Sequence, residues 1–202
     1  TYIEQAHTKE IDMGFSRTEM LVNRLQIDFT EQYVITVGGT NGKGTTCALI
    51  EQICLHAGLT VGVYSSPHLV TFCERIRLNG SLITEASLCD IFEKIDNTRK
   101  DPAQQSIELT YFEFATLAAL KAFSEQKVDV VILEVGLGGR LDAVNVIDAD
   151  IAVITSIGLD HQDWLGDTKE KIAFEKAGIF RANTPAIIGH EFPQKSMLDY
   201  AQ

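Results

Sequence analysis

The stretch that most constrains the fold runs from Val34 to Thr46 and reads VITVGGTNGKGTT. The β-branched run from Tyr33 to Val37 predicts a buried strand, and the sequence from Thr45 to Ala57 predicts a helix. Glycines occupy positions 38, 39, 42 and 44 between them. Glycines let backbone N–H groups approach a phosphate at the start of a helix, so this order predicts a strand, a phosphate-binding loop and a helix.

Two kinds of side chain in this loop suit a nucleotide. Lys43 offers a positive charge to the β- and γ-phosphates, and Thr45 or Thr46 offers a hydroxyl to Mg²⁺. The spacing departs from the usual phosphate-loop pattern, because a glycine instead of Ser or Thr follows Lys43 directly. The alternative is a flexible strand-to-helix connection, which does not explain a lysine flanked by glycines at a helix start.

Composition limits the class of protein. The chain has 202 residues, of which 45% are hydrophobic and 22% charged, as in an ordinary soluble domain. It has no apolar run long enough to cross a membrane and no signal-peptide pattern, so we expect a cytoplasmic protein without a membrane partner. A net charge of −11 argues against a nucleic-acid partner. The four cysteines form no C-x-x-C pair, which favours reduced thiols.

Helix and strand signals alternate along the rest of the chain. Residues 16–19 have the pattern of a capping box, which predicts a helix to about Ile27. Further helices are expected over 85–100, 110–126 and 169–177, and strands over 60–64, 75–78, 82–83, 128–135, 150–156 and 184–189. The helix after the phosphate loop is expected to bury one apolar face, formed by Leu49, Ile50, Ile53 and Cys54. This alternation predicts an α/β fold, a mostly parallel sheet with flanking helices.

Polar residues follow several of the predicted strands. Ser65 and Ser66 follow the strand over 60–64, Glu134 lies near the end of the next long strand, and His161 follows the strand over 150–156. Ligands of open α/β sheets bind at the carboxyl ends of the strands. Together with the phosphate loop, these residues therefore predict a Mg-nucleotide site.

Each of these residues also has a structural alternative. The stretch over 65–77 can be a surface loop leading into a hairpin at Asn79-Gly80. Glu134 can form an ion pair with Arg140, and His161 can be a hydrogen-bonded structural histidine. Glu113 completes a second capping box, with Thr110, and is interpreted as a cap rather than a catalyst.

Five motifs in fixed order resemble the folylpolyglutamate synthase/dihydrofolate synthase family of the Mur ligase superfamily. They are GTNGKGT at 39–45, YSSPHL at 64–69 with ER at 74–75, EVGLGGRLD at 134–142, LDH at 159–161 with LG at 165–166, and EKAGI at 175–179. The likeness extends from about Tyr2 to the end of the chain and is strongest to bacterial bifunctional enzymes.

The resemblance implies an ATP-dependent amide ligase of folate biosynthesis and one-carbon metabolism. Such an enzyme adds L-glutamate to dihydropteroate or to folate through an acyl phosphate. The resemblance further implies that residues 1–202 are an ATP-binding domain like the central domain of Mur ligases, and that the fold is incomplete. Because complete enzymes of the family are about twice this length, the carboxyl-terminal domain would be absent, and we expect this chain alone to be inactive.

The resemblance also assigns roles to individual residues. ATP would contact the loop formed by Gly39, Thr40, Asn41, Gly42, Lys43, Gly44 and Thr45. Up to two Mg²⁺ ions would be held, the first by Thr45, Ser66 and Glu134 and the second by His161. Lys176 matches a lysine that is carbamylated in the superfamily. The pterin would contact Ile11, Met13, Phe112, Asp142 and Ala143. The catalytic set is Lys43, Glu134, His161 and Lys176, and we expect a monomer.

Two other functions remain open at this point. One is a different Mur-type ligase, which would bind an aminosugar-peptide instead of a pterin. Phe112 and Asp142 favour a pterin over that substrate, because they offer a flat aromatic face and a hydrogen-bond acceptor. The other is a non-catalytic module that binds nucleotide or pterin without turnover.

Overall fold

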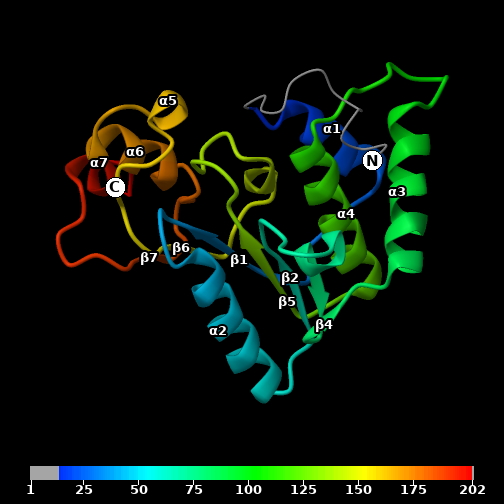
Figure 1. The fold of residues 1–202 in the computed structure, drawn as a ribbon, viewed down its shortest axis with the longest axis horizontal. Coiled ribbons are helices and arrows are strands. Elements are labelled where there is room, and N and C mark those ends of the chain that lie inside the picture. Colours follow the sequence, from blue (N-terminus) through cyan, green and yellow to red (C-terminus); the bar gives the residue numbers. More distant parts are fainter. Residues whose placement is uncertain (1–13, 202) are drawn as a thin grey trace.

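The computed structural model describes residues 14–201 and contains one seven-stranded sheet in the order β4-β3-β2-β5-β1-β6-β7 (Figure 1). The strands are β1 (Tyr33–Gly38), β2 (Val61–Tyr64), β3 (Ile76–Leu78), β4 (Ser81–Leu82), β5 (Val130–Glu134), β6 (Ile151–Ile154) and β7 (Ala186–Ile188). The α-helices are α1 (Ser16–Arg24), α2 (Lys43–His56), α3 (Glu85–Arg99), α4 (Tyr111–Gln126), α5 (Gln162–Leu165), α6 (Lys169–Ala177) and α7 (Lys195–Tyr200). Within residues 14–201 there are also two 3₁₀ helices, η2 (Phe72–Arg75) and η3 (Ala143–Val146).

The sheet is mostly parallel, as the sequence predicted. Strands β2, β5, β1, β6 and β7 are parallel, and the hairpin of β3 and β4 adds two antiparallel strands at one edge. The central strand β1 lies between β5 and β6, with Val37 opposite both Glu134 and Val153. The loops after β1, β2, β5 and β6 therefore leave the same edge of the sheet, which brings the predicted polar residues together.

Both faces of the sheet are covered, because side chains of successive strand residues point to opposite faces. Val131 and Leu133 of β5 belong to the larger core cluster, which α1, α3, α4 and α6 also line. Val130 and Ile132 belong to a smaller cluster that includes Cys47 of α2. Helices α1, α3 and α4 thus lie on one face and α2 on the other (Figure 1).

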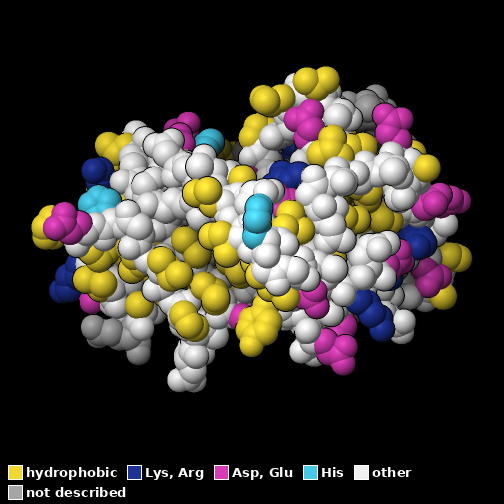
Figure 2. All heavy atoms as spheres, turned by 90° about the horizontal axis from the view of Figure 1, so that it is seen from below, with side chains coloured by type: hydrophobic (Ala, Val, Ile, Leu, Met, Phe, Trp, Pro, Cys, Tyr) yellow, Lys and Arg dark blue, Asp and Glu magenta, His cyan; other side chains and the backbone are white. Residues whose placement is uncertain are grey.

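Helix α2 differs from the prediction in two respects. It begins at Lys43 instead of Thr45, because Gly42 adopts the left-handed conformation (φ +85°) and serves as the N-cap. The predicted apolar face is wrong for Leu49 and Ile53, which are 60% and 68% exposed. The helix rests on the sheet through other positions, namely Cys47 and Glu51, which are buried, and Ile50 and Cys54, which are half-buried. Hydrophobic side chains consequently reach the surface on the side that Figure 2 views.

The two predicted capping boxes had different outcomes. Thr110 and Glu113 form one at the start of α4, as expected. The predicted box at 16–19 is wrong, because α1 already begins at Ser16 and its N-cap Phe15 offers no side-chain hydrogen bond. The elements η2, η3, α5 and α7 were not predicted, since segments this short carry no helical periodicity. Within residues 14–201, none of the helices has the length and apolar character needed to cross a membrane.

Candidate functional site

The phosphate loop joins β1 to α2 and depends on two glycines with positive φ. Gly39 has φ +136°, and a Cβ atom at this position would lie 2.0 Å from Oγ1 of Thr155. Gly42 has φ +85°. Side chains are therefore excluded at both positions, which leaves the backbone N–H groups at the start of α2 accessible to an anion.

The segment after β6 holds the phosphate loop in place. Thr155 Oγ1 donates a hydrogen bond to the Asn41 carbonyl (2.7 Å), and Ser156 Oγ accepts one from the Asn41 N–H (3.0 Å). Thr40 Oγ1 accepts a hydrogen bond from the Gly158 N–H (2.9 Å). The sequence analysis did not identify these contacts. The available signal was the pair of hydroxyl residues, Thr155 and Ser156, directly after β6. The sequence does not show which loop they contact, because this depends on the order of the strands in the sheet.

Two lysines converge on one carbonyl of the loop. Lys43 Nζ donates to the Gly39 carbonyl (3.0 Å) and to that of Thr40 (3.3 Å), and Lys176 Nζ donates to the same Gly39 oxygen (3.0 Å). Burial and the positive charge of Lys43 lower the pKa of Lys176 to about 8. Two ammonium groups this close repel each other, so the arrangement favours binding of an anion such as a phosphate.

Glu134 lies at the carboxyl end of β5, and its Oε2 accepts a hydrogen bond from the Ser66 N–H (3.1 Å). The alternative ion pair with Arg140 is wrong, because Arg140 pairs with Glu175 (2.9 Å). Burial raises the pKa of Glu134, although the Ser66 N–H and the charges of Lys43 and of an arginine on β3 act in the opposite direction. Within residues 14–201, Glu134 forms no ion pair.

The donor atoms around Glu134 fit a hard divalent cation. A buried carboxylate without a directly paired cation is costly, and a Mg²⁺ ion would compensate it through oxygen ligands. Glu134 and the Ser66 hydroxyl supply such oxygens, and Thr45 lies in the exposed first turn of α2. Within residues 14–201, no group of three or more His, Cys, Asp or Glu side chains is arranged so that it could hold a metal ion. This suits Mg²⁺, which keeps several water and phosphate ligands, better than it suits a metal held entirely by protein.

His161 lies nearby but is far more exposed than Glu134. Its side chain is 56% exposed, its backbone is left-handed (φ +49°), and its Nε2 is 3.6 Å from the Asp160 carboxylate. The described part of the chain shows no hydrogen bond to this ring, so the alternative of a hydrogen-bonded structural histidine is not supported. The ring is free to contact a ligand in the adjoining cavity.

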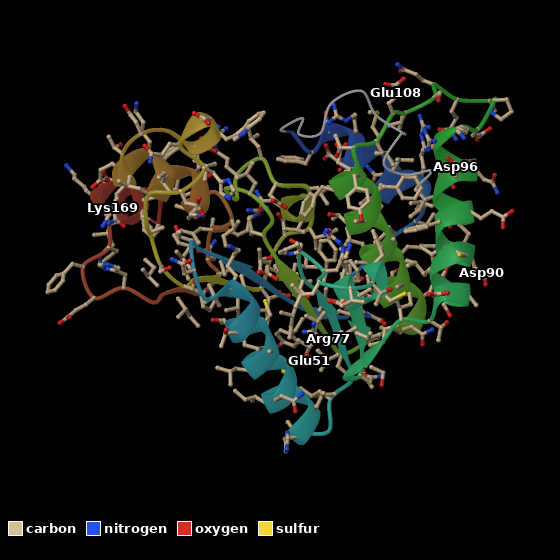
Figure 3. All side chains as sticks on the ribbon, viewed as in Figure 1. Glu51, Arg77, Asp90, Asp96, Glu108 and Lys169 are labelled. Atoms are coloured by element: carbon tan, nitrogen blue, oxygen red, sulfur yellow. The ribbon has the colours of Figure 1, made fainter. Side chains whose placement is uncertain are left out.

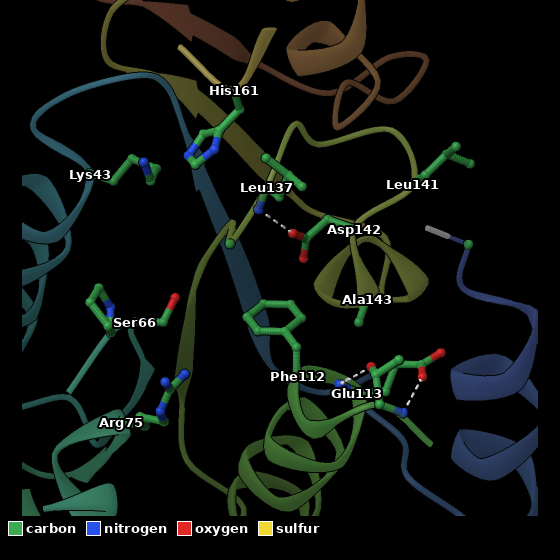
Figure 4. Close-up of a pocket in the computed structure, with 14 residues that line it drawn as sticks. Lys43, Ser66, Arg75, Phe112, Glu113, Leu137, Leu141, Asp142, Ala143 and His161 are labelled. Carbon is green, nitrogen blue, oxygen red and sulfur yellow. Dashed lines mark hydrogen bonds between the residues drawn. The ribbon is translucent and has the colours of Figure 1, made fainter. Parts of the chain in front are cut away.

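A cavity of about 420 Å³ is lined by Lys43, Ser66 and His161 and by the predicted pterin residues Phe112, Asp142 and Ala143 (Figure 4). Lys43, Ser66 and Arg75 lie on one side of it, and Phe112, Asp142 and Ala143 lie toward the other. The lining residues are Gly14, Lys43, Ser66, Pro67, Arg75, Thr110, Phe112, Glu113, Gly136, Leu137, Leu141, Asp142, Ala143 and His161. The predicted Ile11 and Met13 lie outside the described residues.

Phe112 presents its ring to the cavity because Gly136 makes room for it. A Cβ atom at position 136 would lie 2.4 Å from Cζ of Phe112. Gly136 thus packs against the ring and lines the same cavity. The ring of Phe112 therefore forms a flat aromatic surface on the cavity wall.

Asp142 is buried beside Phe112 and organises the backbone around it. Its two oxygens accept hydrogen bonds from the Leu137 N–H (2.8 Å) and the Val144 N–H (3.0 Å). Burial is the largest influence on this carboxyl and raises its pKa to about 6, against the lowering effect of these hydrogen bonds. Each carboxylate oxygen can accept two hydrogen bonds, so Asp142 retains acceptor capacity toward the cavity.

Arg75 places a buried guanidinium on the cavity wall. Its Nε donates to Nδ1 of His68 (2.8 Å), and its charge lies over the rings of Phe72 (5.6 Å) and Tyr111 (5.4 Å). In the described part of the chain no carboxylate forms an ion pair with it. A buried cation of this kind favours an anionic ligand, for which guanidinium is suited geometrically.

Glu113 also lines the cavity, which the sequence did not reveal. Its carboxylate accepts hydrogen bonds from the Thr110 N–H (2.8 Å) and from Nε of Arg17 (3.0 Å). Its interpretation as a cap is confirmed. The contact with Arg17 also ties α1 to α4 at the edge of the cavity.

Comparisons with known proteins agree with this geometry. A model of the Mur ligase middle domain matches residues 37–200. The dihydrofolate synthase/folylpolyglutamate synthase of Haemophilus influenzae is 52% identical over 202 residues, which are 100% of this chain and 45% of that protein. E. coli FolC in complex with DHPP and ADP superposes with a TM-score of 0.93 at 50% identity, over 98% of this chain and 47% of that one.

A further solved structure, a bifunctional folylpolyglutamate synthase/dihydrofolate synthase with Mn, AMPPNP and L-glutamate bound, matches with a TM-score of 0.89 at 50% identity. The match covers 98% of this chain and 47% of that chain. The chain therefore spans a little under half the length of the relatives it matches.

Proposed function

The chain belongs to the Mur ligase family through its middle domain, and we propose that it is the ATP- and pterin-binding part of a dihydrofolate synthase/folylpolyglutamate synthase. The enzyme would use ATP to join L-glutamate to dihydropteroate or to a folate. Residues 1–202 would form the ATP-binding domain, and the remainder of a full-length enzyme would complete the site.

One observation carries this proposal. A single cavity is lined by Lys43 of the phosphate loop and by Phe112 and Asp142. A nucleotide phosphate and an acceptor with a flat heteroaromatic ring would thus share one cavity, as phosphoryl transfer from the nucleotide to the acceptor's carboxylate requires. The structures of two relatives, one in complex with DHPP and ADP and the other with Mn, AMPPNP and L-glutamate bound, support binding of a nucleotide together with a second ligand.

The chemistry follows from the groups on the two sides of the cavity. The acceptor's carboxylate attacks the γ-phosphorus of ATP, which breaks the bond to ADP and forms an acyl phosphate. The amine of L-glutamate then attacks the acyl carbon, forms the amide and releases phosphate. Lys43 would stabilise the charge on the transferring phosphoryl group, and Arg75 would hold a carboxylate of the acceptor.

Glu134, Ser66 and Thr45 would hold Mg²⁺, with His161 at a second ion. When bound, the metal would neutralise charge on the phosphoryl oxygens and orient them. Lys176 would react with CO₂ through its neutral amine, forming an N–C bond and releasing a proton, and so become a carbamate. A pKa of about 8 supports this assignment, because it leaves a neutral fraction of the amine near physiological pH.

The alternatives have less support. An aminosugar-peptide ligase would gain nothing from the aromatic surface of Phe112 beside the buried Asp142 carboxylate. A non-catalytic module would need neither Lys43 at the acceptor's cavity nor Glu134 at the adjoining cavity. The monomeric state and the cytoplasmic location stay predictions.

The direct test is glutamate-dependent ADP formation by a full-length polypeptide carrying this sequence, with MgATP and dihydropteroate. We expect ADP formation that requires both L-glutamate and the pterin. ADP formation that instead requires an aminosugar-peptide would identify a different Mur-type ligase. Ligand binding without turnover would identify a binding module.

Acceptor binding should weaken as pH falls through about 6. The pKa of Asp142 is raised to about 6, so its carboxylate is ionised above that pH and accepts hydrogen bonds from the amino-substituted edge of a pterin. Below it, the protonated carboxyl has lost acceptor capacity. Calorimetric titration of dihydropteroate between pH 5 and 8 should show this loss (about a tenfold change in Kd per pH unit at most). An Asp142→Asn variant should bind weakly at every pH, and a pH profile that survives this substitution would contradict the role.

Replacing Arg75 by glutamine should raise the KM for the acceptor about 10- to 100-fold, the range for a lost charged hydrogen bond. The KM for ATP should stay unchanged, because Arg75 lies on η2 and not in the phosphate loop. Arg181→Gln, at a residue that pairs with Asp148 and does not line the cavity, is the matched control. Steady-state kinetics with each substrate varied in turn distinguish the two parameters. Equal changes in both KM values would argue against a specific contact with the acceptor.

A further inference from the structure

A buried ion pair lies behind the Ser66–Glu134 contact and is not part of the site described so far. Glu51 of α2 is 4% exposed, and Arg77 of β3 donates to it from Nε (3.2 and 3.0 Å to the two oxygens) and pairs through Nη2 (3.0 Å). The two side chains meet between helix and sheet (Figure 3). Burying such a pair costs desolvation energy, and a pair of hydrophobic residues would pack here at no such cost. Its presence therefore calls for another role.

The pair is connected to Ser66 through the preceding residue. Nη1 of Arg77 donates to Ser65 Oγ (3.2 Å), while the Ser65 N–H donates to the Arg75 carbonyl (2.9 Å). Ser65 is thereby fixed at both its side chain and its backbone. The next N–H along the chain, that of Ser66, donates to Glu134.

These groups surround one cavity on the α2 side of the loop. It has a volume of about 330 Å³ and is lined by Gly44, Ala48, Glu51, Ser65, Ser66, Pro67, Arg77 and Glu134. Ser66 and Pro67 also line the larger cavity, so this loop forms the wall between the two. Holding Ser65 therefore fixes the wall that carries the Ser66 oxygen donor.

The charges of the pair matter as much as its contacts. Arg77 alone would place a positive charge beside Glu134 and repel a divalent cation. Glu51 alone would add a second carboxylate to the same cavity and attract the cation away from the reacting phosphates. Together the two charges cancel, so the pair can hold the loop while leaving the net charge at Glu134 unchanged.

We propose that Arg77, neutralised by Glu51, is a positioning residue that holds Ser65 and Ser66 so that Ser66 and Glu134 meet the same divalent cation. This inference rests on the cation site of the proposed function. It gives Arg77 and Glu51, which lie outside that site, two roles: they position its ligands and balance the charge around them.

The test compares Arg77→Gln, Glu51→Gln and the double variant in the full-length polypeptide. Mn²⁺ affinity is measured by electron paramagnetic resonance in the presence of a non-hydrolysable ATP analogue, and kcat is measured with MgATP. Glu51→Gln leaves a positive charge uncompensated and should weaken Mn²⁺ binding about 2- to 160-fold, the range of coupling between neighbouring groups. Arg77→Gln leaves a negative charge near the cation but releases Ser65. These two effects oppose each other, so this variant should bind Mn²⁺ more tightly than the double variant.

The double variant removes both charges, so the net charge near Glu134 is that of the unmodified protein. Because Ser65 and Ser66 are no longer held, its Mn²⁺ affinity should stay at least about twofold weaker, and its kcat should be about tenfold low or lower. Arg99→Gln is the control, since Arg99 is paired with a carboxylate, Asp96, but lies on α3 and does not line this cavity. It should change neither readout.

A double variant that binds Mn²⁺ as tightly as the unmodified protein, or a Glu51→Gln variant with unchanged Mn²⁺ affinity, would overturn the inference. A failure of the proposed function is a separate result, because it appears as absent glutamate-dependent ADP formation in the unmodified protein. Because Mn²⁺ affinity is measured without turnover, it tests the positioning role of Arg77 even if the unmodified protein forms no ADP.

Discussion

Replacing Lys43 by alanine should lower the kcat for glutamate-dependent ADP formation about 10²- to 10³-fold, as expected when one preorganised charge donor is removed from a phosphoryl-transfer site. Lys43 Nζ lies within hydrogen-bond distance of two carbonyls of its own loop, Gly39 and Thr40, and can exchange them for phosphate oxygens. Acceptor binding should change much less than kcat, because the ring of the acceptor would contact Phe112 and Asp142 and its carboxylate would contact Arg75. The measurement is steady-state kinetics together with calorimetric binding of dihydropteroate.

Lys94→Ala is the matched control. Lys94 pairs with Glu125 at the surface of α3 and α4 and does not line the cavity, so its loss removes a lysine without touching the site. A Lys43→Ala enzyme that keeps more than a tenth of its kcat would contradict the role of Lys43 in phosphoryl transfer.

The second large effect is expected at Glu134. A Glu134→Gln variant should lose at least 10²-fold in kcat, because the amide keeps the shape of the carboxylate but not the charge that a divalent cation requires. The same variant should be more stable. Burial raises the pKa of Glu134, so above that pKa the ionised carboxylate destabilises the folded state, and glutamine relieves this cost. Thermal unfolding at pH 7.5 should show Tm higher by about 2–4 °C for each kcal/mol recovered.

A loss of activity combined with a gain in stability distinguishes a functional carboxylate from a structural one. Glu125→Gln serves as the control, because Glu125 forms a surface ion pair and should change neither quantity appreciably. A drop in Tm with Glu134→Gln would instead show that Glu134 supports the fold.

Much of the site could be predicted from the sequence because it follows strand ends. Glu134 ends β5 and Ser66 follows β2 closely, while Lys43 and His161 are reached by the loops that leave β1 and β6. Parallel strands align their carboxyl ends, so these residues converge. The capping patterns were less reliable: the box of Thr110 and Glu113 formed, but the one predicted at 16–19 did not. The resemblance to a family then supplied Phe112 and Asp142, which no local pattern distinguishes from core residues.

The remainder depends on contacts that a sequence pattern does not encode. Glu51 interrupts the expected apolar face of α2, and only the strand order brings Arg77 of the edge hairpin beneath it. Gly136 accommodates the ring of Phe112, a contact between distant residues that no local pattern indicates. Thr155 holds the phosphate loop from more than a hundred residues away, across the β1–β6 pairing.

Transfer of ¹⁸O from the acceptor to phosphate tests the central claim most directly. Dihydropteroate labelled with ¹⁸O in its carboxylate is incubated with the full-length polypeptide, MgATP and L-glutamate, and the released phosphate is analysed by mass spectrometry. If the carboxylate attacks the γ-phosphorus to form an acyl phosphate, each phosphate released will carry one ¹⁸O atom. Phosphate without the label, formed at the same rate as ADP, would show that water attacks ATP and would contradict the ligase mechanism.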